Sequence, residues 1–354
     1  MNQPADKALM NQLLESDSTG WRSFDYIYQQ LRQTCQDLRL AELFGDDPEQ
    51  ALSLDELTRR SGVPPHSMRL FAMACVAFGL LRKDDQGGYV PAGALAWKMS
   101  PLPDDFGWIR QVYLPSWAHL TTSLSEGTNA GLRVLPGSGA TLYERMTHYP
   151  ELEKVFTAAR GQTVMNRRLP LLLGALNTLP AFAHVLDVGG GDGTAARSIA
   201  ANFEQARVTV LDLPSVAEHG RIQAAEHGGA KVDFVGGDAF AGTWPTEVDV
   251  VVFSAFLEIF SAERIQAALR QAYASLPVGG HLLINQTYCN DDETGPMWPA
   301  VLSLYFLNLA SGEGMCYPAS DFERWCRESG FTEIRHFAQN PGDDARVLIA
   351  RKER

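Results

Sequence analysis

Three aspartates follow three β-type runs in the second half of the chain. Asp187 lies in HVLDV and precedes Gly189-Gly190-Gly191-Asp192-Gly193, Asp212 follows VTVL, and Asp238 follows VDFVGG. The glycines allow a tight turn and let a ligand approach the backbone closely. The stretch from Gly191 to Ala196 also satisfies the dinucleotide pattern G-x-G-x-x-A, and Asp212 could hold a ribose in either case. These residues therefore predict a nucleoside-containing ligand.

The positions of Asp187 and Asp238 distinguish a dinucleotide from another nucleoside-containing ligand. A carboxylate two residues before the first glycine would repel a pyrophosphate, whereas it suits an ammonium group. Asp238 stands beside Phe240, and an acid next to an apolar ring suits the amino group and the face of adenine. S-adenosylmethionine (SAM) carries an ammonium group, a ribose, an adenine and a sulfonium. We therefore expect SAM to be the cofactor.

These motifs resemble the class I SAM-dependent methyltransferases of the small-molecule O-methyltransferase type, found in plant phenolic and bacterial natural-product pathways. The resemblance covers nearly the whole chain and includes DVGGGDG at 187–193, VLDLPSV at 210–216, GGDAF at 236–240 and LPVGGHLLI at 276–284. It implies roles for the residues that match. Those implied to contact the cofactor are Asp187, Gly189, Gly190 and Gly191 at the methionine, Asp212 at the ribose, Leu213, Asp238, Ala239 and Phe240 at the adenine, and Ser254 nearby.

The chain departs from the family at the general base. The family usually carries L-H-D-W-S-D-E after the fourth strand, and its His removes the proton of the acceptor; here the stretch is LEIFSAE, with Glu258 in the place of that His. An ordinary carboxylate is a weak base for a phenol, but burial would raise its pKa. Alternatively the acceptor is an amine, a thioether or an acidic oxygen that needs little base. A further interpretation is that Glu258 is an acid at the entry of the following helix, near Arg264, and has no catalytic role. A second departure is Gln286, where the family tends to have Glu.

Four further residues are candidates for the substrate pocket. Arg160 occupies a place where relatives often have Met, and it could clamp a carboxylate or simply be solvated. Tyr143 and His148 flank the same helical entry, although a lone His is more often structural. Phe253 belongs to a set of aromatic residues that could line a pocket or fill the core.

Alternation of β-type runs and helices from His184 onward predicts the elements that position these residues. The runs HVLDV, VTVLDL, VDFVGGD, DVVVF and HLLIN alternate with helices that include 194–202 and 262–275, which is typical of an open parallel sheet. FTEIRHF and ARVLIARK then predict an antiparallel hairpin at the edge of the sheet. The fold class is therefore α/β, and the resemblance implies a Rossmann-like domain with a mostly parallel seven-stranded sheet.

A different pattern occupies the first hundred residues. Ser53 is a good N-cap for a helix that begins at Leu54, a turn follows at 61–65, a second helix covers 67–78, and 80–90 reads as a β-hairpin. This order is that of a winged helix. The second helix, SMRLFAMACVAF, has one Arg and no Lys and is apolar over more than one face, which favours a homodimer interface over DNA binding. We expect a winged-helix dimerisation domain at 1–105, a helical linker contributing to the pocket at 106–180, and a SAM-binding catalytic domain at 181–354.

Composition limits the partners. The chain of 354 residues has 30 Lys and Arg against 42 Asp and Glu, a net charge of −12, which is a poor match for nucleic acid or an anionic membrane. The five cysteines are scattered without a C-x-x-C pair, and no spacing of His, Cys and carboxylates indicates a metal site. The first residues lack an apolar signal segment, so we expect a cytoplasmic protein.

Three functions remain open from the sequence. The leading hypothesis is a methyltransferase that acts on a small specialised metabolite at O, N or S and releases S-adenosylhomocysteine (SAH). A second is an enzyme of the same fold that cyclises SAM itself to azetidine-2-carboxylate and methylthioadenosine. A third is a winged-helix regulator, against which the net charge argues.

Overall fold

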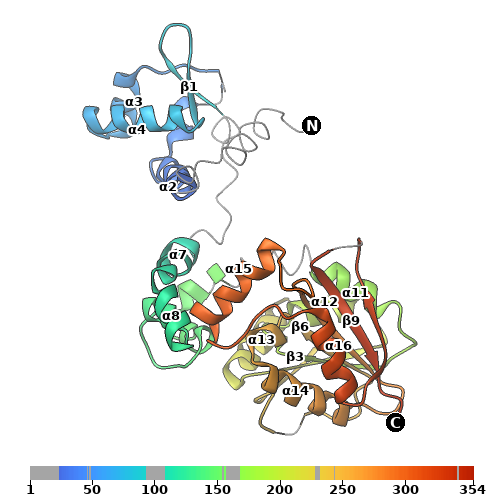
Figure 1. Ribbon diagram of the computed structural model, residues 1–354. Coiled ribbons are helices and arrows are strands. Elements are labelled where there is room, and N and C mark those ends of the chain that lie inside the picture. Colours follow the sequence, from blue (N-terminus) through green and yellow to red (C-terminus); the bar gives the residue numbers. More distant parts are fainter. Residues whose placement is uncertain are drawn as a thin grey trace. The chain divides into compact units, whose positions relative to one another are not determined.

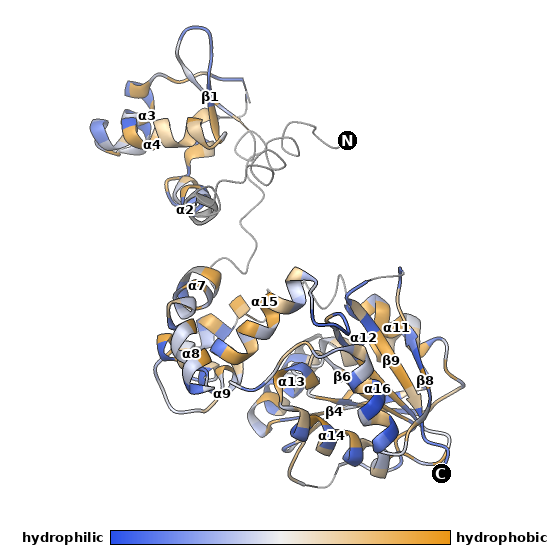
Figure 2. Cartoon of the chain, in the orientation of Figure 1, coloured by the Kyte–Doolittle hydropathy of each residue, from blue (hydrophilic) through white to orange (hydrophobic). Residues whose placement is uncertain are grey.

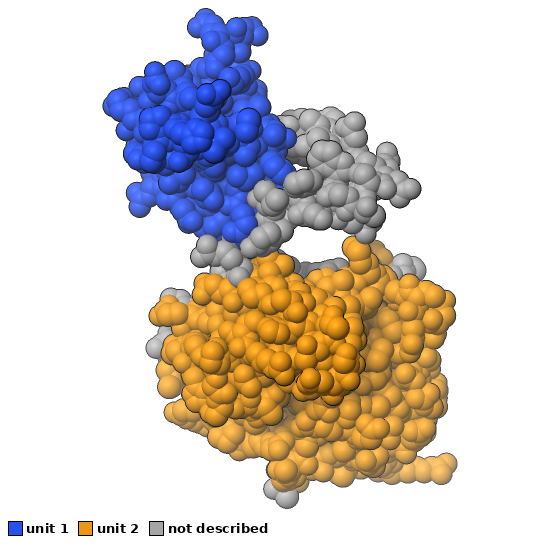
Figure 3. Space-filling model, turned by 60° about the vertical axis from the view of Figure 1, so that its left-hand side comes forward, with its two compact units in different colours: residues 1–106 blue, residues 107–354 orange. Residues whose placement is uncertain are grey.

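The computed structural model describes residues 24–45, 47, 49–92, 108–153, 155–156, 168–227, 232–242, 244–340 and 343–354. The chain divides into two compact units, Met1–Phe106 and Gly107–Arg354 (Figure 3). The stretch 107–180, expected as a helical linker, belongs to the second unit together with the cofactor motifs.

The first unit contains the helix, turn, helix and hairpin that the sequence predicts. Its elements are α2 (Phe24–Asp37), the 3-10 helix η2 (Leu40–Phe44), α3 (Leu54–Ser61), α4 (Pro65–Ala77), β1 (Leu81–Lys83) and β2 (Tyr89–Pro91). The Ser53 hydroxyl accepts a hydrogen bond from the backbone N–H of Glu56, so the predicted N-cap is confirmed. Helix α4 begins two residues before the predicted start because Pro65, which lacks an N–H, fits its first turn.

A seven-stranded sheet forms the centre of the second unit's described residues. Its strand order is β5-β4-β3-β6-β7-β9-β8, with β3 to β7 parallel and β8 and β9 antiparallel, as predicted (Figure 1). The strands are β3 (His184–Val188), β4 (Arg207–Asp212), β5 (Val232–Gly236), β6 (Val250–Ser254), β7 (His281–Thr287), β8 (Thr332–Phe337) and β9 (Ala345–Arg351). Strand β9 lies inside the sheet, between β7 and β8, so β8 is the edge strand.

Helices cover both faces of this sheet. They are α11 (Leu169–Leu176), α12 (Thr194–Asn202) and α13 (Pro214–His227) on one face, and α14 (Ala262–Ser275) and α16 (Ala319–Glu328) on the other. The apolar stretch after Leu169 is thus a core helix followed by a strand, as expected. Figure 2 shows hydrophobic residues concentrated along α11 and β9. Two separate hydrophobic clusters result, one on each side of the sheet.

A third hydrophobic cluster joins the helices before the sheet to those after β7. The elements of this region are η3 (Ile109–Tyr113), α7 (Leu114–Ser116), η4 (Trp117–His119), α8 (Leu120–Glu126), η5 (Ala130–Val134), α9 (Leu142–Met146), α15 (Met297–Tyr305) and η8 (Phe306–Ala310). The fully buried Asn308 accepts a hydrogen bond from the Ser123 hydroxyl at 2.7 Å and donates to the Ser116 carbonyl at 3.0 Å. This network ties η8 to α7 and α8, and so holds together the helical segment that these elements form.

Candidate functional site

The glycine-rich loop between β3 and α12 depends on two glycines. Gly189 has φ +73°, and a Cβ atom there would lie 2.0 Å from Cδ2 of Phe256, so no other residue fits. Gly191 has φ +61°, and no described atom lies within 4 Å of the position that its Cβ would take. Its N–H donates to Oδ2 of Asp212 at 2.8 Å. The loop is therefore fixed on the Phe256 side and open at Gly191, where a ligand can approach the backbone.

Asp187 is a buried carboxylate without a donor. Its side chain is 1% exposed, and neither oxygen has a hydrogen-bond partner among the described residues. Burial raises its pKa to about 7, and the nearby carboxylates of Asp212 and Asp192 contribute in the same direction. Two unpaired buried acceptors are costly unless a ligand supplies donors. The site therefore fits the ammonium group that the sequence leads us to expect.

Asp212 and Leu213 stand at the end of the neighbouring strand β4. Besides the Gly191 N–H, the Asp212 carboxylate accepts the N–H of Leu213 at 2.7 Å, and the Leu213 side chain is exposed. A carboxylate has lone pairs for more than two donors, so ribose hydroxyls can bind there as well. The apolar surface of Leu213 suits the face of a base.

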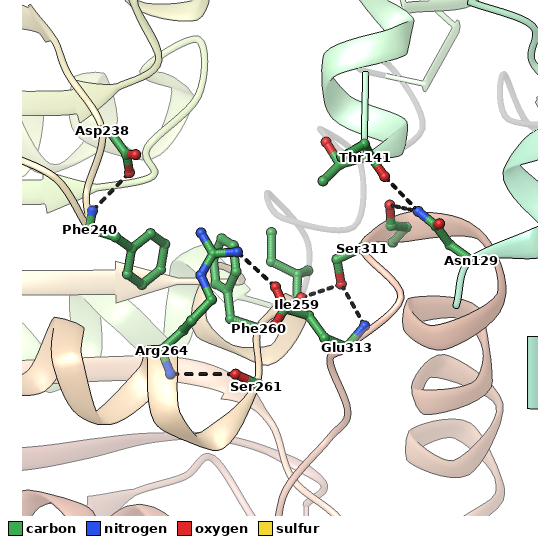
Figure 4. Close-up of polar contacts among 12 residues, drawn as sticks. Asn129, Thr141, Asp238, Phe240, Ile259, Phe260, Ser261, Arg264, Ser311 and Glu313 are labelled. Carbon is green, nitrogen blue, oxygen red and sulfur yellow. Dashed lines mark hydrogen bonds and ion pairs between the residues drawn. The ribbon is translucent and has the colours of Figure 1, made fainter. Parts of the chain in front are cut away.

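Asp238, Ala239 and Phe240 follow β5, the next strand. One Asp238 oxygen accepts the N–H of Phe240 at 2.9 Å (Figure 4). The Ala239 carbonyl accepts the Nε1–H of Trp244 at 3.1 Å. Because β3, β4 and β5 are adjacent and parallel, their carboxyl ends, and with them the three aspartates, lie along one edge of the sheet. The sheet order thus brings together the cofactor residues that the sequence singled out.

Strand β6 ends in a strained backbone at the same edge. Ala255 follows Ser254 with φ +53°, a conformation that is unusual for a residue with a Cβ and often marks a functional site. The Ser254 hydroxyl accepts a hydrogen bond from Nδ2 of Asn285 at 3.1 Å. Ser254 therefore lies at the end of β6, with β7 on one side and β3, the strand that leads into the glycine loop, on the other.

Glu258, the candidate base, is held in a buried ion pair with Arg168. Its Oε1 lies 3.0 Å from Nη2 of Arg168, and its Oε2 accepts the N–H of Thr287 at 3.2 Å. The side chains of Glu258 and Arg168 are 4% and 9% exposed. Arg264, the partner suggested by sequence proximity, pairs instead with Glu313 at 2.7 Å. Both oxygens of the Glu258 carboxylate are therefore engaged by donors of this chain.

The Arg168 guanidinium also binds the end of β7. Its Nη1 donates to the Asn285 carbonyl and its Nη2 to the Thr287 hydroxyl, each at 3.1 Å, and Nδ2 of Asn285 donates to the Arg168 carbonyl at 3.0 Å. No pattern in the sequence identifies this partner, which stands 90 residues before Glu258. Gln286 is also buried, and both polar atoms of its amide lack a hydrogen-bond partner among the described residues.

Of the described substrate candidates, two lie on or just after α9 and the third lies in β6. Tyr143 is partly buried on α9, where its ring packs against Phe156 at 6.3 Å between centroids, and His148 is exposed in the turn after that helix. Phe253 is fully buried, with Trp244 and Phe256 as neighbours, so we assign it to the core and not to a pocket wall. Arg160 lies outside the described residues.

The described part of the chain contains no group of three or more His, Cys, Asp or Glu side chains that could hold a metal ion. Within those same residues, no helix is both long and apolar enough to cross a membrane.

Comparison with known proteins gives one family match and several similar chains. A family model for an O-methyltransferase domain matches residues 117–332. L-tyrosine C(3)-methyltransferase from Streptomyces lavendulae is 29% identical over 329 residues, which are 90% of this chain and 87% of that protein. 3-Hydroxy-5-methyl-1-naphthoate 3-O-methyltransferase from Streptomyces sahachiroi is 29% identical over 79% of this chain and 80% of its own length. The apo crystal structure of the S-adenosylmethionine-dependent methyltransferase SibL has a TM-score of 0.70 and 30% identity, with 94% and 97% of the two chains covered.

Proposed function

The chain belongs to the O-methyltransferase family, whose cofactor is SAM, and from this premise we propose that it methylates a small hydroxylated aromatic metabolite. The observation that carries the proposal is Asp187, a buried carboxylate without a donor beside a glycine loop that is open at Gly191. The names of two similar proteins support the acceptor class. One acts on tyrosine at a ring carbon, the other on a hydroxynaphthoate at an oxygen.

Three strand ends would hold the cofactor. Asp187 would bind the ammonium group, Asp212 the ribose hydroxyls, and Asp238 with Phe240 the adenine, since each offers the chemistry its part of the ligand requires. SAM would supply a methyl group: an aligned nucleophile bonds to the methyl carbon as the bond between that carbon and the sulfonium sulfur breaks, and SAH leaves as a neutral thioether. The protein's contribution is then to align the acceptor and to exclude water.

We propose that Glu258 acts as a positioning residue through its ion pair with Arg168. The pair ties η7 (Leu257–Ile259), which follows β6, to the end of β7, and so would set the distance between the cofactor and the acceptor. Since both oxygens of Glu258 are held by Arg168 and by the Thr287 N–H, we favour an acceptor with an acidic hydroxyl, which needs little help from a base. Its phenolate would react at oxygen or at the adjacent ring carbon.

Incubation with SAM tests the reaction class. Methyl transfer predicts that SAH forms only after a hydroxylated aromatic compound is added, with the compound gaining one methyl group by mass spectrometry. Release of methylthioadenosine from SAM alone would contradict the proposal, because that product indicates cyclisation.

Removing the Asp212 carboxylate is expected to weaken SAH binding. The variant Asp212→Ala leaves ribose hydroxyls without an acceptor, which costs about 1–3 kcal/mol, or about 5-fold to 150-fold in Kd. Isothermal titration calorimetry measures this change. Asp233→Asn is the matched control, because Asp233 is an exposed carboxylate near the start of β5, whereas Asp238 follows the end of that strand. Binding of NAD in place of SAM or SAH would refute the cofactor assignment.

We also propose that the first unit mediates a homodimer. On α4, the side chains of Leu70 and Met73 are 49% and 62% exposed, and an apolar helix of this kind stabilises contacts between subunits.

Light scattering at micromolar concentration is therefore expected to report a dimer. The double variant Leu70→Glu, Met73→Glu should be a monomer, whereas Val278→Glu, which changes an exposed residue of the second unit, should stay dimeric. A monomeric wild type, or sequence-specific binding to duplex DNA at physiological salt, would argue against this use of the first unit.

A further inference from the structure

Arg264 is in contact with two aromatic rings at the adenine end of the site. Its Cζ lies 4.2 Å from the ring centroid of Phe240 and 4.5 Å from that of Phe260 (Figure 4). Its Nη1 donates to Oε1 of Glu313 at 2.7 Å. A guanidinium over an aromatic face is attracted by the electrons of the ring, and Arg favours such stacking because its guanidinium is planar.

These contacts determine how the Phe240 ring can lie. Besides the guanidinium, the ring has Phe260 edge-on at 4.6 Å and Phe256 nearly parallel at 6.1 Å between centroids. Phe256 in turn packs against the glycine loop, at the place where a Cβ on Gly189 would clash. Phe240 is therefore oriented by its neighbours before any ligand binds, and one of the three groups that pack on its ring, Arg264, is charged.

Glu313 connects Arg264 to a loop that reaches the helical segment. The loop follows η8, and in it the Ser311 hydroxyl donates to the carbonyl of Ile259, next to Glu258. A Cβ on Gly312 would lie 3.1 Å from the backbone nitrogen of Asn129, and the Asn129 amide donates to the Ala140 carbonyl at 2.8 Å. Figure 4 shows Arg264, Glu313, Ser311, Ile259 and Asn129 with these polar contacts.

We propose that Arg264 is a positioning residue for the adenine of the cofactor, acting through Phe240, and that Glu313 fixes the guanidinium in place. The proposal rests on the SAM site proposed above and adds a residue to it. The side chains of Arg264 and Glu313 are 42% and 31% exposed, and an ion pair that is exposed to this degree adds little to folding stability. Loss of Arg264 should therefore change ligand binding and leave the stability of the protein nearly unchanged.

The test compares ligand binding by full-length variants. Arg264→Met keeps an unbranched apolar side chain and removes the cation, and it should raise the Kd of SAH about tenfold by calorimetry. Arg264→Lys restores a cation near the ring but cannot stack a planar group on it. Its Kd for SAH should therefore lie between that of the wild type and that of Arg264→Met. Arg324→Met is the matched control, because Arg324 also stands over an aromatic ring, Trp325, and pairs with Asp321, but on α16. Its Kd should equal that of the wild type.

A selectivity measurement separates positioning from a general loss of structure. S-inosylhomocysteine carries an oxo group in place of the amino group of adenine, so Asp238 should make the wild type prefer SAH. In Arg264→Met the Phe240 ring should be less firmly oriented. The ratio of the Kd for S-inosylhomocysteine to the Kd for SAH should therefore be smaller than in the wild type, while the melting temperature stays unchanged. Unchanged SAH binding by Arg264→Met, or equal weakening of both ligands with a lowered melting temperature, would overturn the proposal. A wild type that binds neither ligand would instead overturn the cofactor site itself.

Discussion

Replacing Glu258 by Gln is expected to lower the free energy of unfolding of the second unit by about 3–5 kcal/mol. The substitution keeps the shape and removes the charge, so the Arg168 guanidinium is left buried without a counter-ion. The neighbouring Asn285 carbonyl and Thr287 hydroxyl can still accept hydrogen bonds from Arg168, but neither carries a charge. Urea unfolding, followed by a probe in the sheet domain, measures the loss.

Two further variants make this prediction specific to the buried pair. Glu333→Gln removes one partner of an exposed pair with Arg351 and should cost about 1 kcal/mol or less. The double variant Glu258→Leu, Arg168→Met replaces both charges by apolar groups and should recover much of the stability lost in Glu258→Gln. Wild-type stability in Glu258→Gln would mean that the pair contributes nothing to folding.

The same variant tests the positioning role in catalysis. We expect turnover to fall while SAH affinity changes little, because the three aspartates proposed to hold the cofactor do not include Glu258. Activity is measured at a temperature at which the variant remains folded. Full turnover from about pH 6 to 9 would leave Glu258 as a purely structural residue.

The affinity for SAH is expected to rise with pH up to about pH 7 and then to level off. The pKa of Asp187 is raised from 3.8 to about 7 in the ligand-free protein, whereas the ammonium group needs the ionised carboxylate. Below this pKa, binding must first release a proton, so Kd should fall about tenfold per pH unit as pH rises. Calorimetry between about pH 5.5 and 8.5 records the profile.

Variants of the neighbouring acids test the origin of this dependence. Asp187→Asn should bind SAH more weakly above pH 7 and should lose the pH dependence. Asp212→Asn should move the midpoint to lower pH, because the charge of Asp212 helps to raise the pKa of Asp187. Asp233→Asn should leave the profile unchanged. A flat profile in the wild type would contradict the assignment of Asp187 to the ammonium group.

The same pKa shift also affects the stability of the ligand-free protein. A carboxyl group whose pKa is higher in the folded state than in the unfolded chain binds its proton more tightly when folded. Stability therefore decreases as pH rises from 3.8 toward 7, and bound SAH should offset this loss above pH 7.

The sequence by itself determined the elements and the cofactor loop. Strand β3 and the helices α12 and α14 have the predicted bounds, because short apolar runs, glycine turns and caps such as Ser53 act within a few residues. The three aspartates could be placed together because the carboxyl ends of neighbouring parallel strands share an edge of the sheet.

Only the tertiary structure decided which side chains meet around that edge. Strand β9 enters the sheet between β7 and β8 through hydrogen-bond pairing that no local pattern specifies. Glu258 pairs with a guanidinium 90 residues away, although Arg264 is six residues away and was the partner suggested by the sequence. Strand order and packing bring Arg168 and the Thr287 N–H to the Glu258 carboxylate, and neighbours along the chain encode neither of them.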